Sequence, residues 1–282
     1  MSEQGAVSHL AYDWMIVMYF FLGGLSVGAY LFSVAANYWK QEFKHLAKRS
    51  AVLSLIALAI GMFMLLIHLG RPDRTWRIFT YFNPQSMLSW GAWILNIFGL
   101  LALIYTCLLF INKEIAAKKF AYLGLPFALL TAIYTAIHIA RAPDKLLWHS
   151  TMMPVLFLNG AIISGIAGVM LFSANSNNTA LLSKLGRFVA WMVMVELCMV
   201  LAEVLMLLNG GTESIAVAKF LVSGNIGFLF VGVEIVLGAV VPAAILLKAK
   251  PSALLQIAAS LLILIGIFAM RYVIVVGGQL IC

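Results

Sequence analysis

Charged residues are scarce in this chain. They make up 10% of its 282 residues, whereas hydrophobic residues make up 64%. A water-soluble surface needs about a quarter of its residues charged. A chain of this composition cannot cover itself in water, so a soluble enzyme or binding domain is excluded. The sequence predicts an integral membrane protein.

Cysteine is scarce as well, and its three positions, Cys107, Cys198 and Cys282, are far apart. A structural zinc ion or an iron–sulfur cluster takes about four ligands. Because the chain has no CxxC pair and too few cysteines, we expect neither centre in it.

Long apolar runs take up most of the chain. The hydrocarbon core of a bilayer is about 30 Å thick, which a helix crosses in about 20 residues. Eight runs have this length, separated by connections too short for a soluble domain, and they fall at about 14–38, 50–69, 89–111, 120–140, 153–173, 188–208, 224–247 and 253–276. We therefore expect eight transmembrane helices.

Lysine and arginine lie mainly in the short connections between these runs. This placement is typical of topology signals and not of a nucleic-acid-binding surface, in spite of the net charge of +8. Eleven basic residues follow odd-numbered runs, and six follow even-numbered runs. The positive-inside rule then places the first set in the cytoplasm and both ends of the chain outside.

The densest polar stretch lies between the second and third runs. It begins with His68-Leu-Gly-Arg-Pro-Asp-Arg-Thr-Trp76, continues with Asn83-Pro-Gln-Ser86 and ends with Ser89-Trp-Gly-Ala-Trp93. Long cations and aromatic rings settle where a membrane ends. We interpret the stretch as the rim of a quinone pocket and part of a docking face for an electron-transfer partner.

This polar stretch is echoed 70 residues later. Ile67-His-Leu-Gly-Arg-Pro-Asp73, followed by Trp76, resembles Ile137-His-Ile-Ala-Arg-Ala-Pro-Asp144, followed by Trp148. Each copy ends an even-numbered run, so the first two runs and the next two form hairpins of the same orientation. Repeats of the same orientation are related by an axis along the membrane normal. This predicts a four-helix bundle over residues 1–145, with both motifs at its outer mouth. A second four-helix bundle would follow over residues 146–282. Chance similarity between apolar sequences is the alternative.

The first motif carries the residue types that a quinone site needs. His68 and Arg71 share one face of a helix, which Pro72 then ends. A quinone head group needs hydrogen-bond partners at both carbonyls and a nearby proton donor or acceptor, and histidine serves both purposes near neutral pH. We predict His68, Arg71 and Asp73 as quinone ligands. The alternative is an interfacial helix cap in which Arg71 and Asp73 merely pair.

The second motif supports the same argument with the candidates His138, Arg141 and Asp144. Tyr134 lies one helical turn inward of that histidine and adds a hydroxyl on the same face. Asp13 and Tyr19 lie at the start of the first run, at or just inside the outer surface. Tyr12 and Tyr19 also fit the aromatic belt of a membrane surface.

Four ionisable residues fall inside apolar runs, at Glu196, Glu203, Glu234 and Arg271. A charge at membrane depth costs about 2.5–3.5 kcal/mol on insertion scales, so such residues normally face a bundle interior and pair. Glu196 and Glu203 are seven residues apart and share a helix face. One interpretation is a proton path through the second bundle. The other is a buried ion pair of Arg271 with Glu234 or Glu203.

A b-type haem is usually held by two histidines from facing helices. His68 and His138 could supply such a pair on the outer side. No histidine falls at the cytoplasmic depth of any run, which excludes a two-haem relay across the membrane. We expect no haem and no metal in this chain.

Three segments together resemble the NrfD/polysulfide reductase membrane-subunit (PsrC-like) family: residues 68–93, Leu22-Gly-Gly-Leu-Ser-Val-Gly-Ala-Tyr30 and Arg271-Tyr-Val-Ile-Val-Val-Gly-Gly-Gln279. The resemblance extends over nearly the whole chain. It implies a haem-free, eight-helix anchor of the bacterial inner membrane that binds menaquinone or ubiquinone near the outer surface of the first bundle. Carried over by position, that site comprises His68, Arg71, Asp73, Asp13, Tyr19 and Tyr134.

The resemblance also implies two partners, a four-cluster ferredoxin-like iron–sulfur subunit and a catalytic subunit of the molybdopterin type. The residues agree with this, because a chain without metal ligands needs a soluble redox partner to transfer electrons. Basic residues of the outer connections are able to face an acidic partner surface. They are Arg71, Arg74, Arg77, Arg141 and Lys145.

Two other functions stay open. Eight spans, a repeat and intramembrane glutamates also fit a proton-coupled secondary transporter, although a transporter site is expected near the midplane, with broken helices. The third possibility is a passive membrane anchor that binds no quinone.

Overall fold

The computed structural model describes residues 12–69, 81–140, 146–173, 179–248 and 252–280. Within these ranges the chain is helical, without strands, and eight helices are long and apolar enough to cross a membrane. The first six spans are α2 (Trp14–Tyr38), α3 (Lys44–His68), α5 (Met87–Phe110), α6 (Glu114–Ala140), α7 (Met153–Phe172) and α8 (Thr179–Leu208). The predicted all-α integral membrane protein with eight transmembrane helices is confirmed.

The last two spans each consist of three consecutive helical segments. The seventh combines α10 (Gly224–Gly227), the π-helix η4 (Phe228–Val240) and α11 (Val241–Leu246). The eighth combines α12 (Ala253–Tyr272), the π-helical η5 (Val273–Gly277) and α13 (Gly278–Leu280). The shorter elements are η1 (Gln41–Phe43), η3 (Leu146–His149) and α9 (Thr212–Val222).

Three helices begin earlier than the apolar runs that predicted them. They are α3, α6 and α8, which begin at residues 44, 114 and 179, where the runs begin at 50, 120 and 188. The first two turns of these helices carry charged residues such as Lys44, Glu114 and Lys184. Charged side chains are acceptable in a helix at head-group level but are left out of an apolar run. The helices therefore extend beyond the hydrocarbon core at this end.

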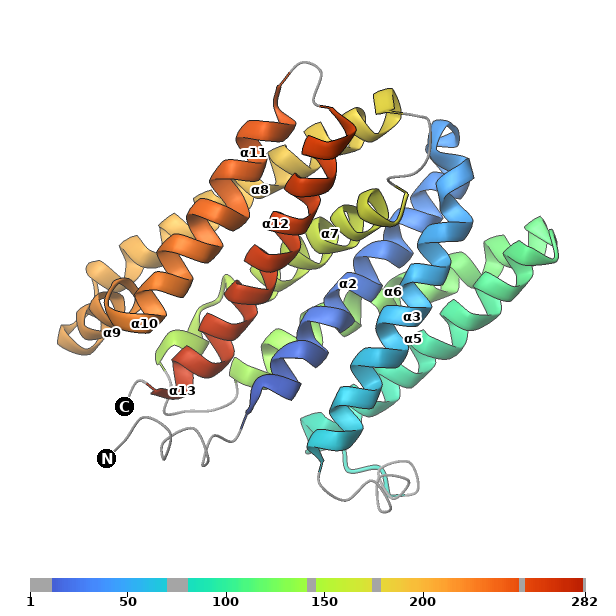
Figure 1. The fold of residues 1–282 in the computed structure, drawn as a ribbon. Helices are drawn as coiled ribbons and strands as arrows, with labels where there is room; N and C mark the ends of the chain where they lie inside the picture. Colours follow the sequence, from blue (N-terminus) through green and yellow to red (C-terminus); the bar gives the residue numbers. More distant parts are fainter. Residues whose placement is uncertain (1–11, 70–80, 141–145, 174–178, 249–251, 281–282) are drawn as a thin grey trace.

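Helices α2 and α7 hold the two halves of the chain together. In Figure 1, α2, α7 and α12 lie in the middle, with α3, α5 and α6 on one side and α8 and α11 on the other. A side chain at Gly28 of α2 would overlap the backbone of Ala161 in α7, and one at Gly165 would overlap the backbone of Gly28. Small residues thus let the two backbones touch, as is common between helices in membranes. Because this contact joins residues before and after 145, the division into two separate bundles stays a prediction.

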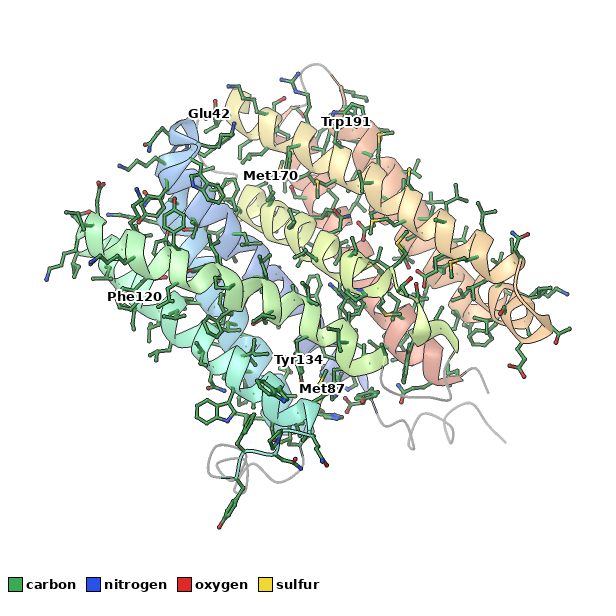
Figure 2. The ribbon with its side chains drawn as sticks, turned by 180° about the vertical axis from the view of Figure 1, so that it is seen from behind. Glu42, Met87, Phe120, Tyr134, Met170 and Trp191 are labelled. Carbon is green, nitrogen blue, oxygen red and sulfur yellow. The ribbon has the colours of Figure 1, made fainter. Side chains whose placement is uncertain are left out.

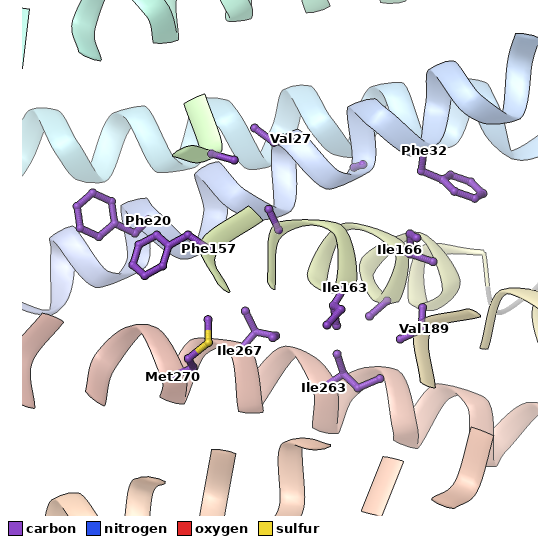
Figure 3. Close-up of a cluster of buried hydrophobic side chains, with 14 of the residues drawn as sticks. Phe20, Val27, Phe32, Phe157, Ile163, Ile166, Val189, Ile263, Ile267 and Met270 are labelled. Carbon is purple, nitrogen blue, oxygen red and sulfur yellow. The ribbon is translucent and has the colours of Figure 1, made fainter. Parts of the chain in front are cut away.

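Apolar side chains fill the space between these central helices. Figure 3 shows Phe20 of α2 beside Phe157 of α7, with Ile267 and Met270 of α12 on the other side of α7. The Phe20 and Phe157 rings meet nearly edge to face, with centroids 6.4 Å apart. All four side chains are buried. This layer separates the two sites described below.

The ends of several helices meet at one end of the molecule, which we call the His68 end. It contains the beginnings of α2 and α5, the ends of α3 and α6, and the carboxyl-terminal segment α13 (Figure 1). Direct contacts join these pieces, since Tyr12 bonds to Gln279 and Asp13 bonds to His68. The candidate site lies here.

Candidate functional site

A cavity of about 570 Å³ lies at the His68 end, among α2, α3, α5 and α6. Most of its lining is apolar, including Ile16, Met62 and Leu95. The polar side chains on its wall belong to Tyr12, Tyr19, His68, Asn96, Tyr134 and His138. A space of this size with an apolar wall and a few convergent polar groups is typical of a site for a small organic molecule.

Asp13 holds His68 in a fixed orientation. The Oδ1 atom of Asp13 caps α2 by accepting hydrogen bonds from the backbone N–H groups of Met15 (3.0 Å) and Ile16 (3.3 Å). The same oxygen lies 3.0 Å from Nδ1 of His68. A carboxylate only accepts, so Nδ1–H donates to it, and Nε2 of a neutral ring is left as an acceptor. The first helix turn therefore sets which nitrogen of His68 can take a proton.

Tyr134 reaches the cavity because the facing helix has a glycine. A side chain at Gly91 in α5 would overlap the phenol ring of Tyr134 in α6. Figure 2 shows Tyr134 on α6, with Met87 at the start of α5 close to it in that view. One turn further along α6, the His138 ring lies 5.7 Å from that of Tyr134, centroid to centroid. The two side chains form a continuous polar strip on the cavity wall.

Tyr12 is held by the opposite end of the chain. Its backbone N–H donates to Oε1 of Gln279 (3.0 Å), and Nε2 of Gln279 donates to its carbonyl (2.8 Å). Its ring packs edge-on against His138 and Trp148, and its hydroxyl lies 3.5 Å from Nε2 of His138. Partial burial raises the pKa of the Tyr12 phenol, so the hydroxyl stays protonated near neutral pH.

The structure thus brings five of the predicted site residues together, four on the cavity wall and Asp13 behind His68. Those on the wall are Tyr19, His68, Tyr134 and His138. The remaining candidates, Arg71, Asp73, Arg74, Arg77, Arg141, Asp144 and Lys145, lie outside the described residues.

Sequence reasoning missed two polar groups of the cavity, Tyr12 and Asn96. The sequence pattern favours the aromatic belt over a site for Tyr12, and the contact of this residue with Gln279 spans 267 residues. Asn96 is a single amide within the third apolar run, and this isolation was the available signal. Its Nδ2 donates to the carbonyl of Ala92 (2.8 Å), one turn back in the same helix.

The intramembrane ionisable residues lie in the other half of the molecule, and their pairing differs from the one expected. Arg271 is 2% exposed, and its Nη2 donates to the Phe157 carbonyl (2.9 Å) while the guanidinium lies 3.5 Å from the centroid of the Phe157 ring. The carboxylate that interacts with it is Glu196, on α8. Neither Glu203 nor Glu234 forms an ion pair with Arg271 in the part of the chain that the structure describes. The expected pair with Glu234 or Glu203 is not seen among the described residues, and Glu234 lines one small cavity with Glu203 and another with Glu196.

Fold and cavity together define a class, a membrane protein with eight spans and a mainly apolar cavity with a few polar side chains at one end. The family described as "Polysulphide reductase, NrfD" matches residues 3–282. The chain therefore belongs to this family, as its motifs predicted.

Curated relatives are similar at low identity. The chain is 24% identical to a selenate reductase subunit of Mesobacillus selenatarsenatis, over 98% of this chain and 76% of the relative. It is also 24% identical to a polysulfide reductase chain of Wolinella succinogenes, over 96% of this chain and 95% of the relative. A shorter match, 26% identical over 51% of this chain and 36% of the relative, is to the Hdr-like menaquinol oxidoreductase integral membrane subunit of Archaeoglobus fulgidus. The relatives are subunits of reductases, and some are named as membrane subunits.

Proposed function

We propose that this chain is the quinone-reactive membrane subunit of a multi-subunit iron–sulfur oxidoreductase. It exchanges electrons between the membrane quinone pool and a docked iron–sulfur subunit. The observation that carries the proposal is the cavity at the His68 end, with the Asp13–His68 pair on one side and Tyr134 and His138 on another.

The residues of the cavity fit a quinone head group. The volume of about 570 Å³ lies within the range of small-molecule sites, and the apolar wall suits a lipid-soluble ring. Polar groups come from α3 (His68) and from α6 (Tyr134 and His138), so hydrogen bonds to two carbonyls can come from different helices. Menaquinone and ubiquinone both present this pattern of two carbonyls on an apolar ring.

Each side chain has a distinct role in this proposal. A bound quinol supplies two electrons and two protons when it is oxidised. The electrons pass to the iron–sulfur partner, and His68 accepts the two protons one after the other at Nε2 and releases each to the water outside. The fixed carboxylate of Asp13 stabilises the imidazolium that forms each time. The Tyr134 and Tyr12 hydroxyls bind and orient the ring from the α6 side, and Tyr12 keeps its own proton. In the reverse direction His68 returns the two protons in the same way.

Electron transfer requires a partner, because the three cysteines of this chain are too few and too far apart to hold a cluster. We infer a ferredoxin-like iron–sulfur subunit at the His68 end, and beyond it a catalytic subunit, of the molybdopterin type. The predicted basic docking residues Arg71, Arg74, Arg77, Arg141 and Lys145 belong to connections at this end. The naming of several relatives as parts of reductases supports a multi-subunit complex.

The proposed setting is the bacterial inner membrane, with the His68 end facing the periplasm. Eight spans bring both termini to the same side. The excess of lysine and arginine in the connections at the other end supports this orientation through the positive-inside rule.

Turnover of the intact complex with a water-soluble quinol tests the proposal. His68→Ala and Asp13→Asn should lower quinone-coupled turnover by about 10²-fold, since each removes part of the proton acceptor. Turnover of the complex with an artificial electron donor or acceptor at the catalytic subunit should be unchanged. His45→Ala is a matched control, because this exposed histidine lies on the same helix α3 at the opposite end.

Unchanged quinol turnover in both variants, in complexes that assemble fully, would refute the site assignment. A complex that retains no quinone and is insensitive to quinone analogues would indicate a passive anchor. Solute uptake by the chain alone, without any redox partner, would indicate a transporter.

A further inference from the structure

The second half of the chain contains two buried carboxyl groups, a partly exposed third and one buried guanidinium. Glu196 and Glu203 lie on α8, Glu234 lies on the π-helical η4, and Arg271 lies on α12. Glu196 is 7% exposed and Glu234 is 9% exposed. Glu234 interacts electrostatically with both other glutamates, and Glu196 interacts with Arg271. The four side chains therefore form one connected group, which we call the carboxylate cluster.

The charges of this cluster do not balance. With all four groups ionised, three negative charges would face one positive charge in apolar surroundings. The elements packed around it add the Phe157 carbonyl from α7 and Gly24 from α2, while α9 and η5 contribute only Leu221, Val273 and Ile274 to its small cavities. No further titratable group lines these spaces among the described residues. Because buried like charges repel and desolvation disfavours ionisation, at least one carboxyl group must carry a proton.

The cluster also contains polar atoms that have no protein partner. These atoms are Oε2 of Glu234 and Nε and Nη1 of Arg271, all buried in side chains at least nine-tenths covered. Buried polar atoms in membrane interiors normally have partners, because each one left alone is costly. Ordered water is able to satisfy such atoms where a cavity beside them has room for it.

Two small cavities lie beside Glu234, and Arg271 lines neither of them. One, of about 30 Å³, is lined by both Glu203 and Glu234. The other, of about 20 Å³, is lined by both Glu234 and Glu196. A single water molecule needs roughly 10–15 Å³ of such space, so each cavity has room for at least one. Glu234 thus stands between two water-sized spaces, each shared with one of the other glutamates.

The cluster extends inward from the His68 end. Glu203 lies five residues before the end of α8 at Leu208, and Glu196 lies two helical turns further from that end. Glu203 is partly exposed and interacts with the Ser150 hydroxyl, in the connection before α7. Figure 1 shows α9, which follows α8, at the same end as α13. Only Glu203 is therefore close to the aqueous phase, and Glu196 with Arg271 forms the inner limit.

We propose that Glu196, Glu203, Glu234 and Arg271 form a hydrated proton-binding site that exchanges protons with the aqueous phase at the His68 end. A proton passes from external water near Ser150 to the Glu203 carboxylate, then through one water to Glu234 and through the second to Glu196. Each transfer leaves the donor carboxyl ionised and the acceptor neutral. Arg271 remains charged and stabilises Glu196 whenever that carboxyl group is ionised. Neither quinone nor an iron–sulfur partner takes part, so this site is independent of the proposed function.

Infrared difference spectroscopy of the full chain in detergent micelles, without added quinone, tests the site. At neutral pH the wild-type protein should show a carboxylic-acid carbonyl band that shifts when H₂O is replaced by D₂O. Glu234→Gln and Glu196→Gln should each remove or shift this band. Glu213→Gln is the matched control, because this exposed glutamate of α9 lies outside the cluster and should leave the band unchanged.

The entry route is tested separately with Glu203→Gln, at the hydrated edge of the cluster. This variant should keep a protonated carboxyl group but slow its deuterium exchange by about tenfold or more, because a proton-relay group is lost. Absence of the band in wild-type protein, or its persistence in the triple glutamine variant, would overturn the site. An unchanged exchange rate in Glu203→Gln would overturn the route, and that variant stays informative where Glu234→Gln fails to fold.

Discussion

The two halves of the molecule treat buried polar groups in opposite ways. At the His68 end of the first half, a few polar side chains reach a mainly apolar space of about 570 Å³, and some are held from behind, as Asp13 holds His68. In the second half, charged side chains enclose spaces of about 20 and 30 Å³ and leave some of their own atoms without protein partners. The first arrangement suits an organic molecule that enters and leaves. The second suits water and protons.

The largest expected difference between the halves concerns stability. Arg271→Met would leave the three carboxyl groups of the cluster without their cation, and loss of one partner from a buried charged group costs about 3–5 kcal/mol. Thermal unfolding in detergent should show a correspondingly lower melting temperature. Arg187→Met, at an exposed arginine of α8, should change stability by less than about 0.5 kcal/mol. Equal stability of the two variants would show that the guanidinium does not hold the cluster.

The contact that joins the halves should be the next most sensitive. A methyl group at Gly165 of α7 would overlap the backbone of Gly28, so Gly165→Ala should cost about 1–3 kcal/mol. Gly23→Ala is the matched control, because a methyl group there meets no atom within 4 Å, and it should be neutral or stabilising. Chemical denaturation of both variants checks this. A neutral Gly165→Ala would mean that the halves are not tightly packed along α2 and α7.

Filling the open cavity should affect ligand binding more than stability. Ala92 lies on its wall, and Ala92→Phe should weaken binding of a quinone analogue about tenfold, or by about 1.4 kcal/mol. Ala35→Phe provides the comparison, since Ala35 lines a separate, mainly apolar cavity of about 650 Å³ between α2, α6, α7 and α8. Fluorescence titration should show unchanged binding in this control. Equal weakening in both variants would argue against the His68-end cavity as the binding site.

The smallest expected effect concerns Tyr12. Tyr12→Phe removes a long contact with His138 and should cost about 0.5–1.5 kcal/mol in analogue binding. Burial raises the pKa of this phenol, so the contact is fully present below the ordinary tyrosine pKa of about 10 and is lost only as the pH rises through the higher folded value. The difference between wild type and variant should therefore be constant from about pH 6 to pH 9. A difference that changes within this range would assign the titration to another group.

Much of this architecture follows from one-dimensional patterns. Run length and hydropathy predict the eight spans, and the repeated histidine motif predicts that His68 and His138 belong to one end of the first four helices. Both histidines line the same cavity, which agrees with the second of these predictions. Contacts between side chains on different helices could not be predicted from such patterns. The hydrogen bonds of Tyr12 to Gln279 and the choice of Glu196 over Glu234 beside Arg271 depend on how helices rotate against each other. Close packing of Gly238 against Gly266 sets that rotation between η4 and α12.

The bond pair between Gln279 and the backbone of Tyr12 has a consequence for biogenesis. Gln279 holds the backbone of Tyr12, so this part of the cavity wall should take its final position only once α13 lies beside the start of α2. A chain that lacks its eighth span should therefore have an incomplete cavity wall, and retention of the ligand would indicate that assembly is complete. The binding site at the start of the first span thus depends on the end of the last span.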